Sequence, residues 1–484
     1  MITKQFFKSS LIYSIVGALP YASGFLLIPW FMELLTPAQF GINALYISLM
    51  YFIQIIAAWG FDVSVGVLFI EHNDNRQKMR EFLGTVLIVL VFSCSVTALF
   101  FITGGIRLFD VIFGSGSTFD LVPFGIFTVV SGVLNGIFKV YSNLLIYQQR
   151  PERFLWINLL NFLLTIGFSL GILYSFPFTL YGPILGRMIP ACFSAVLSVI
   201  LLSTEYGTSW NKEYAIKLIK YSSPLVIFAL LSWIVNYIDR FLVLRVMGDT
   251  TLVGIYDFSV KLILGIDLIQ IGLISSMNPK IFTIWKTEGK QESTPEVNRY
   301  YSSFTAINLL LIPLFVFLAP LLIPIIIHKE IYFEAFGYLA ILGAGYATRT
   351  WYYMSLAPVL FFKKTQVLPR VFLYSAIFEI AGSTALIYFL GLPGAAIANF
   401  LVKPVQAFFM FLESRKVFRF KVNKLKILFL PILFITVVLC SEWLATDVTR
   451  NFIHAGQLLT SIALVWLAYR KEIIPMMRKI LNRG

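Results

Sequence analysis

The sequence is poor in charged residues, cysteine and histidine. Only 13% of its 484 residues are Asp, Glu, Lys or Arg, about half the share found in soluble globular proteins, which excludes an ordinary soluble enzyme. Its three cysteines have neither disulfide nor metal-ligand spacing. No Gly-x-x-x-x-Gly-Lys-Ser/Thr loop is present, so ATP hydrolysis by this chain is not expected. We therefore predict no catalytic residues, no metal site and no bound cofactor.

Long apolar runs dominate the sequence instead. Hydrophobic residues make up 58% of the chain, and about 20 consecutive apolar residues suffice to span a membrane. Fourteen runs of this length lie at about residues 9–32, 40–65, 82–104, 119–147, 154–175, 179–203, 221–244, 253–283, 300–327, 335–362, 367–390, 392–412, 425–446 and 452–469. The sequence therefore predicts an all-α polytopic membrane protein with about 14 transmembrane helices.

The excess of 38 Lys and Arg over 24 Asp and Glu is unevenly placed along the chain. If the N-terminus lies in the cytoplasm and the spans alternate in direction, nearly all of the loop cations fall on the cytoplasmic side. The opposite side holds only Arg107, Arg245, Lys329 and Arg450. Because this asymmetry follows the positive-inside rule, we predict that both termini are cytoplasmic. The excess of positive charge then reflects the orientation of the chain in the membrane, and nucleic acid is not an expected partner.

Two short segments indicate an internal repeat. Residues 34–42 and 247–255 each end one apolar run and begin the next, and they align without a gap. The same alignment places Gln54 opposite Asp267. Repeats of this kind build a site between two lobes in secondary transporters. We expect lobes at 1–205 and 221–415, a cytoplasmic amphipathic linker at 206–220, and a terminal region at 416–484 with a basic loop, two helices and a cytoplasmic tail.

Several short motifs follow one another in the order found in a known family. In the first half they are Leu34-Leu35-Thr36-Pro37, Phe40-Gly41 and Trp59-Gly60-Phe61-Asp62. In the second half they are Ile238-Asp239-Arg240-Phe241, Gly254-Ile255-Tyr256 and Gly394-Ala395-Ala396-Ile397-Ala398. Through these motifs the sequence resembles polysaccharide transporter flippases of the O-antigen (Wzx) type, which belong to the multidrug/oligosaccharidyl-lipid/polysaccharide exporter superfamily.

The resemblance implies two six-helix lobes around a central cavity, followed by two C-terminal helices. It implies that the chain moves a polyprenyl-diphosphate-linked oligosaccharide, such as an O-antigen repeat unit, to the outer leaflet of the bacterial inner membrane by alternating access. The implied partners are this lipid-linked oligosaccharide, membrane lipids, and the polysaccharide polymerase and chain-length machinery. A cation-coupled multidrug exporter and a lipid II flippase remain open alternatives. A membrane glycosyl polymerase is disfavoured because no large outer loop is present, so no enzyme activity is expected.

Eleven ionisable residues fall inside the predicted spans. The cations are Lys139, Arg187, Arg240, Lys261, Arg349 and Lys403, and the acids are Asp62, Asp239, Asp257, Asp267 and Glu379. An ionisable group at the centre of a spanning helix costs about 2.5–3.5 kcal/mol on insertion scales. Most of these residues must therefore pair with one another or face water, which favours an aqueous cavity within the membrane.

The cations and neighbouring amides suit the implied substrate, because a diphosphate binds several cations or N–H donors at once. We predict that the substrate cavity is lined by Lys139, Arg187, Lys261, Arg349, Lys403, Asn135, Asn143, Asn158 and Asn161. For Lys139, which has Asn four residues before and after it, we favour this role over an ion pair inside the first lobe. Lys261 has an open alternative, since Asp257 precedes it by four residues in the orientation that favours a structural pair.

The remaining intramembrane residues have other predicted roles. Asp267 and Glu379 are candidates for taking up H⁺ or Na⁺ if transport is ion-coupled, or alternatively for neutralising a cation of the cavity. Structural or gating roles are assigned to Asp62, Asp239, Arg240 and Asp257. Hydration is the alternative for Asp62, near the inner end of its span. Because Asp239 and Arg240 are adjacent and point about 100° apart on a helix, we do not expect them to pair.

Overall fold

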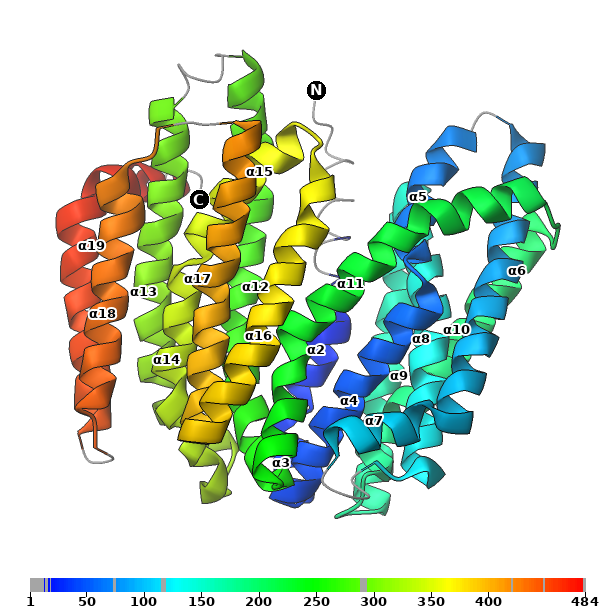
Figure 1. Ribbon diagram of the computed structural model, residues 1–484, viewed down its shortest axis with the longest axis horizontal. Helices are drawn as coiled ribbons and strands as arrows, with labels where there is room; N and C mark the ends of the chain where they lie inside the picture. The colour runs from blue at the N-terminus through cyan, green and yellow to red at the C-terminus, as the bar shows by residue number, and fades with distance from the viewer. Residues whose placement is uncertain are drawn as a thin grey trace. The chain divides into compact units, whose positions relative to one another are not determined.

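A computed structural model describes residues 13, 16, 17, 19–72, 75–114, 119–287, 294–418, 421–446 and 449–481. The described chain is helical throughout and divides into two compact units, residues 1–254 and 255–484. Figure 1 shows long helices running side by side within each unit. The predicted all-α fold is confirmed for the described residues.

The first unit contains the helices of the first half of the chain. They are α2 (Leu19–Leu26), α3 (Ile28–Leu34), α4 (Pro37–Ala58), α5 (Phe61–His72), α6 (Arg76–Phe100), α7 (Ile106–Phe113), α8 (Ile126–Tyr147), α9 (Pro151–Ser175), α10 (Tyr181–Tyr206) and α11 (Lys212–Met247). Two π-helical turns, η1 (Phe101–Gly105) and η2 (Leu121–Gly125), lead into α7 and α8.

The second unit begins within α12 (Thr250–Thr287). Its further helices are α13 (Thr294–Ile326), α14 (Phe336–Ala347), α15 (Arg349–Phe361), α16 (Leu368–Leu390), α17 (Leu392–Val417), α18 (Leu430–Trp443) and α19 (Arg450–Leu481). Three short turns precede α14, α16 and α18, namely η3 (Glu330–Ala335), η4 (Thr365–Val367) and η5 (Leu425–Phe429).

In the described part of the chain, 12 helical segments are long and apolar enough to cross a membrane. The two other expected spans are interrupted. The span expected at 9–32 lies partly outside the described residues, and its described part forms α2 and the start of α3. The span expected at 335–362 is divided into α14 and α15 by a turn at Thr348. The chain is therefore a multi-pass membrane protein.

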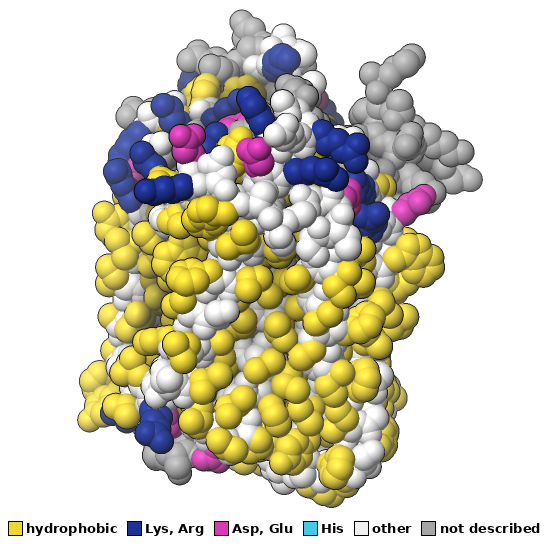
Figure 2. Space-filling view, turned by 90° about the vertical axis from the view of Figure 1, so that its right-hand side faces the viewer, with side chains coloured by type: hydrophobic (Ala, Val, Ile, Leu, Met, Phe, Trp, Pro, Cys, Tyr) yellow, Lys and Arg dark blue, Asp and Glu magenta, His cyan; other side chains and the backbone are white. Residues whose placement is uncertain are grey.

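Charged side chains gather at one end of the face drawn in Figure 2, and a broad hydrophobic surface lies below them. Most of the charged side chains at that end are Lys and Arg. This distribution is the one that the loop asymmetry in the sequence predicts. The assignment of that end to the cytoplasm stays a prediction.

The expected linker at 206–220 is in part the beginning of a spanning helix. Asn211 caps α11, because its side-chain Oδ1 accepts the backbone N–H of Glu213 at 2.9 Å. From Lys212 the helix continues without a break to Met247. The residues before the cap are tied to α6, where Thr85 Oγ1 accepts the backbone N–H of Asn211 at 3.0 Å. The limits of the expected lobes stay predictions.

Two of the family motifs determine where α4 begins and ends. Thr36 and Gln39 form a reciprocal capping box, with Pro37 in the first turn. At the other end, Trp59 and Gly60 have positive φ values of 46° and 71°. At position 60 the glycine adopts this left-handed conformation without strain. A Cβ atom on Gly60 would lie 3.1 Å from the carbonyl oxygen of Ser222 on α11. The Trp59-Gly60 pair therefore divides α4 from α5 and lets this junction pack closely on α11.

Candidate functional site

In the first unit, Lys139 of α8 forms an ion pair with Asp62 of α5. Lys139 Nζ lies 3.0 Å from Asp62 Oδ2, and the side chain of Lys139 is 45% exposed. Asn143, one turn further along α8, donates its amide N–H to the backbone carbonyl of Asp62 at 3.3 Å. The structure thus contains the ion pair within the first unit that the sequence left as the alternative for Lys139. Asp62, for which hydration was the alternative, has Lys139 as a charged partner. The exposed half of Lys139 leaves it accessible to a ligand.

The other predicted amides of this unit contact neighbouring helices. Asn158 of α9 donates to Ser142 Oγ of α8 at 3.0 Å and is buried. Asn161 donates to Ser194 Oγ of α10 at 2.8 Å. Asn135 has a weak contact of 4.0 Å to the sulfur of Met50. Asn158 and Asn161 thus link α9 to α8 and α10, and the role of all three amides toward a substrate stays a prediction.

Arg187 of α10 differs from the other predicted cations. Its guanidinium faces α2, where a Cβ atom on Gly24 would lie 3.5 Å from Nη2. Its Nε atom is buried and has no hydrogen-bond partner. Within the residues that the structure describes, no carboxylate pairs with Arg187. Its charge is therefore available to an anion.

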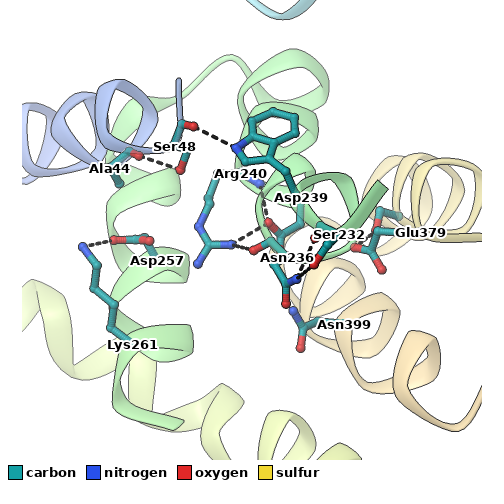
Figure 3. Close-up of polar contacts among 12 residues, drawn as sticks. Ala44, Ser48, Ser232, Asn236, Asp239, Arg240, Asp257, Lys261, Glu379 and Asn399 are labelled. Atoms are coloured by element: carbon teal, nitrogen blue, oxygen red, sulfur yellow. Dashed lines mark hydrogen bonds and ion pairs between the residues drawn. The ribbon is translucent and has the colours of Figure 1, made fainter. Parts of the chain in front are cut away.

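The expectation that Asp239 and Arg240 do not pair is wrong. Arg240 Nη1 donates to Asp239 Oδ1 at 2.8 Å and to the carbonyl oxygen of Asn236 at 2.7 Å (Figure 3). Both side chains are almost fully buried, with exposures of 3% and 0%. Adjacent Cβ atoms do point apart on a helix, but the long arginine side chain curls back along α11 and brings its guanidinium to the neighbouring carboxylate. The structural or gating role assigned to the two residues stays a prediction.

Asn236 is a polar residue of α11 that the sequence prediction omitted. Its side chain is exposed, and Nδ2 donates to the carbonyl oxygen of Ser232 at 2.6 Å. The positions of Ser232, Asn236 and Arg240 are four residues apart, which places them on one helix face. Asn135, Lys139 and Asn143 on α8 have the same spacing of four residues. The sequence therefore contains a signal for Asn236.

In the second unit, Lys261 forms the ion pair with Asp257 that the sequence left open as its alternative role. Lys261 Nζ lies 2.5 Å from Asp257 Oδ2, with the acid four residues earlier on α12. Glu379 of α16 is buried and its Oε1 accepts the hydroxyl of Ser383 at 2.9 Å. Neither contact tests a role in substrate binding or ion coupling.

Arg349 and Lys403 come together at the ring of Tyr346. The guanidinium of Arg349 lies 5.5 Å and the ammonium of Lys403 4.8 Å from the centre of this ring, within the range of cation–π attraction. Lys403 also donates to the backbone carbonyl of Asn399 at 2.8 Å. A Cβ atom on Gly345 would lie 2.9 Å from Lys403 Cδ. Glycine at this position therefore makes room for the lysine stem.

Asp267 of α12 is the acid that Arg349 contacts. Arg349 Nη2 lies 3.5 Å from Asp267 Oδ1, and the two side chains are 16% and 18% exposed. Asp267 thus lies where it can neutralise the charge of Arg349, which is the alternative role that the sequence left open for it. We define Asp267, Tyr346, Arg349 and Lys403 as the cationic centre of the second unit. Its two adjacent cations can hold an anion such as a phosphate group.

At the junction of α8 and α9, outside the spanning segments, Arg150 bonds to Glu205. Arg150 Nη1 donates to Glu205 Oε2 at 2.8 Å. This hydrogen bond raises the pKa of Arg150 above its ordinary value. Arg153 shares the same carboxylate at 2.9 Å. The cluster fastens the junction to the end of α10, and we assign it no part in the candidate site.

We expect the variant Lys139→Gln to fold and to keep nearly all of its stability. A partly exposed ion pair contributes about 0–1 kcal/mol. The comparison variant Arg240→Gln leaves the buried Asp239 without its guanidinium partner and is expected to lose about 3–5 kcal/mol. Thermal unfolding of the purified variants measures both effects. Equal losses in the two variants would contradict this difference between the pairs.

The described chain is an all-helical multi-pass membrane protein with charged side chains buried among its spanning helices. The family model described as "Polysaccharide biosynthesis protein" matches residues 32–329. Since the match extends over more than half of the chain, the chain belongs to this family of polysaccharide biosynthesis proteins. The predicted relation to polysaccharide proteins is thereby confirmed. No curated protein matches the chain.

Solved structures with the same fold are distant in sequence. The lipid II flippase MurJ in an inward closed conformation has a TM-score of 0.70 and 14% identity, covering 96% of this chain and 99% of that chain. An outward-facing multidrug resistance MATE transporter has a TM-score of 0.58 and 12% identity, covering 85% and 95%. A transporter from Pyrococcus furiosus, described as having a binding pocket of reverse polarity, has a TM-score of 0.55 and 13% identity, covering 85% and 95%. These likenesses concern the fold.

Proposed function

We propose that the chain is a flippase that moves a polyprenyl-diphosphate-linked oligosaccharide from the cytoplasmic to the outer leaflet of the bacterial inner membrane. It acts by alternating access, with both termini in the cytoplasm. The cationic centre is the observation that carries this proposal, because Arg349 and Lys403 lie against one ring and suit a diphosphate. Membership of the polysaccharide biosynthesis family supports an oligosaccharide cargo.

Other residues of the chain have proposed parts in this transport. Within the first unit, Arg187 and the partly exposed side chain of Lys139 offer positive charge that can attract an anionic substrate. Asn135, Asn143 and the exposed Asn236 offer amides to the sugars. Glu379 is the proposed site of H⁺ or Na⁺ uptake. The product, an oligosaccharide lipid in the outer leaflet, would pass to a polymerase and its chain-length machinery.

A flipping assay with the purified full-length chain in liposomes tests the proposal. A fluorescent polyprenyl-diphosphate oligosaccharide is placed in both leaflets, and a membrane-impermeant quencher reports the fraction that reaches the outside. We expect the chain to increase this fraction well above that in protein-free liposomes. Ethidium, a cationic drug, is the comparison cargo, and we expect no movement of it because the cationic centre repels it.

Two outcomes of this assay would overturn the proposal. Gradient-driven movement of ethidium without lipid movement would assign the chain to multidrug export. Movement of fluorescent lipid II without movement of the oligosaccharide lipid would assign it to lipid II. The lipid II alternative shares the diphosphate chemistry and differs only in the group that the lipid carries.

A further inference from the structure

The contact between Asp267 and Arg349 is an incompletely formed ion pair. Their closest nitrogen–oxygen distance is 3.5 Å, whereas charge-assisted N–H···O hydrogen bonds are about 2.7–2.9 Å long. Asp267 Oδ1 and Arg349 Nε are buried and have no hydrogen-bond partner in the described part of the chain. The carboxylate therefore neutralises the guanidinium by proximity and leaves its N–H donors unused.

Aromatic rings hold the guanidinium in position without occupying those donors. The centres of the Tyr346 and Tyr352 rings lie 5.5 and 5.9 Å from the central carbon of Arg349. Attraction to ring faces orients the guanidinium plane, while its N–H groups remain able to bond to an oxygen anion. A guanidinium fork binds phosphate in two parallel hydrogen bonds.

The helix that carries Arg349 is interrupted just before this residue. A turn at Thr348 separates α14 from α15, and the Thr348 hydroxyl donates to the carbonyl oxygen of Gly345 at 2.7 Å. The C-terminal end of α14 and the N-terminal end of α15 meet at this turn, so the opposite partial charges of the two helix ends offset each other and the attraction for an anion comes from the side chains. Interrupted helices are a recurrent feature of transporter binding sites.

We propose that Asp267 is a built-in counter-ion that the diphosphate of the substrate displaces from Arg349. In the empty site the carboxylate neutralises the guanidinium. When the substrate binds, its diphosphate takes the two N–H donors of the guanidinium fork and approaches Lys403, and the carboxylate is moved aside. The return of the carboxylate then favours release of the substrate. This inference rests on the proposed function, because it needs a diphosphate as the ligand.

The repeat in the sequence indicates that a neutral side chain is acceptable at this position. Gln54 of α4 occupies the place in the first half that aligns with Asp267 in the second. We therefore expect the variant Asp267→Asn to fold. Without the competing carboxylate, it should bind the diphosphate more tightly and release it more slowly.

Binding of farnesyl diphosphate to the purified full-length chain in nanodiscs tests the inference, with farnesol as the probe that lacks the diphosphate. We expect Asp267→Asn to bind farnesyl diphosphate about tenfold more tightly than the unmodified chain, since coupling between two sites is typically about 5- to 150-fold. Farnesol binding should not change. In the flipping assay the same variant should show a lower KM and a lower kcat.

Two further variants complete the design. Glu413→Gln removes an acid of the same unit that pairs with Lys416, and it should leave the affinity for farnesyl diphosphate unchanged. The double variant Asp267→Asn/Arg349→Gln should lose the gain in affinity, because the gain depends on the guanidinium. Persistence of the gain in the double variant would overturn the inference.

The remaining outcomes separate this inference from the proposed function. If the unmodified chain binds farnesyl diphosphate through Arg349 and Asp267→Asn binds it equally well or more weakly, only the counter-ion inference fails. If the unmodified chain binds farnesyl diphosphate no better than farnesol and moves no oligosaccharide lipid, the proposed function and the inference both fail.

Discussion

Replacing Arg349 with glutamine is expected to abolish transport of the oligosaccharide lipid while the chain remains in the membrane. Losing one partner of a desolvated charge pair costs about 2–5 kcal/mol of binding free energy, which lowers transport at low substrate concentration by about 30-fold or more. The initial rate in the flipping assay measures the loss. In cells that lack other flippases, the surface polysaccharide made through this chain should disappear.

Three comparison variants separate loss of binding from loss of folding. Arg349→Gln leaves Asp267 without its cation, so Arg349→Gln/Asp267→Asn removes both charges and should fold normally but remain inactive. Arg349→Lys keeps the charge without the guanidinium fork and should recover only part of the rate. Lys364→Gln removes an exposed cation beyond α15 and should transport normally. Full transport by a well-folded Arg349→Gln variant would refute the cationic centre as the diphosphate site.

Replacing Gly41 with alanine is expected to prevent normal folding of the first unit. Gly41 lies in α4, where a Cβ atom would come within 1.8 Å of the carbonyl oxygen of Thr250 and 2.9 Å of the backbone nitrogen of Gly254. Because both obstacles are backbone atoms, the helix itself would have to move. We expect a loss of about 3 kcal/mol or more, at or above the upper end of usual overpacking costs.

The yield of monodisperse protein and its thermal unfolding temperature measure this effect. Gly171→Ala on α9 is the matched control, since no atom lies within 4 Å of its added Cβ. Alanine also stabilises a helix relative to glycine, so the control should be at least as stable as the unmodified chain. A Gly41→Ala variant with unchanged yield and unfolding temperature would contradict the close helix contact.

The close contact at Gly41 also gives a physical reason for the glycine that both repeated segments share. The segments 34–42 and 247–255 align as repeats of each other, and Gly41 and Gly254 occupy the same place in both. In the structure, a Cβ atom on Gly254 would lie 3.1 Å from the backbone nitrogen of Gly41. The two glycines are therefore needed where the repeated segments approach each other. Alignment of the segments indicates their likeness but not this contact.

Ion pairs between residues close in sequence were only partly predictable. The pair of Asp257 and Lys261 follows from helix geometry, because side chains four residues apart lie on one face. Asp239 and Arg240 are also close in sequence, yet their pairing was missed. Their Cβ directions diverge, and the torsion angles of a long side chain decide where its charge ends.

The sequence by itself determined the class of the protein, the positions of most of its spans and the uneven distribution of its loop cations. These properties depend on local composition, since about 20 apolar residues form a spanning helix whatever surrounds them. Only the tertiary structure decided which charges on different helices meet. Lys139 reaches Asp62, and Arg349 lies beside Asp267 and shares a ring with Lys403, across helices that are distant in the chain. The packing of those helices sets these distances, and no local pattern in the sequence encodes it.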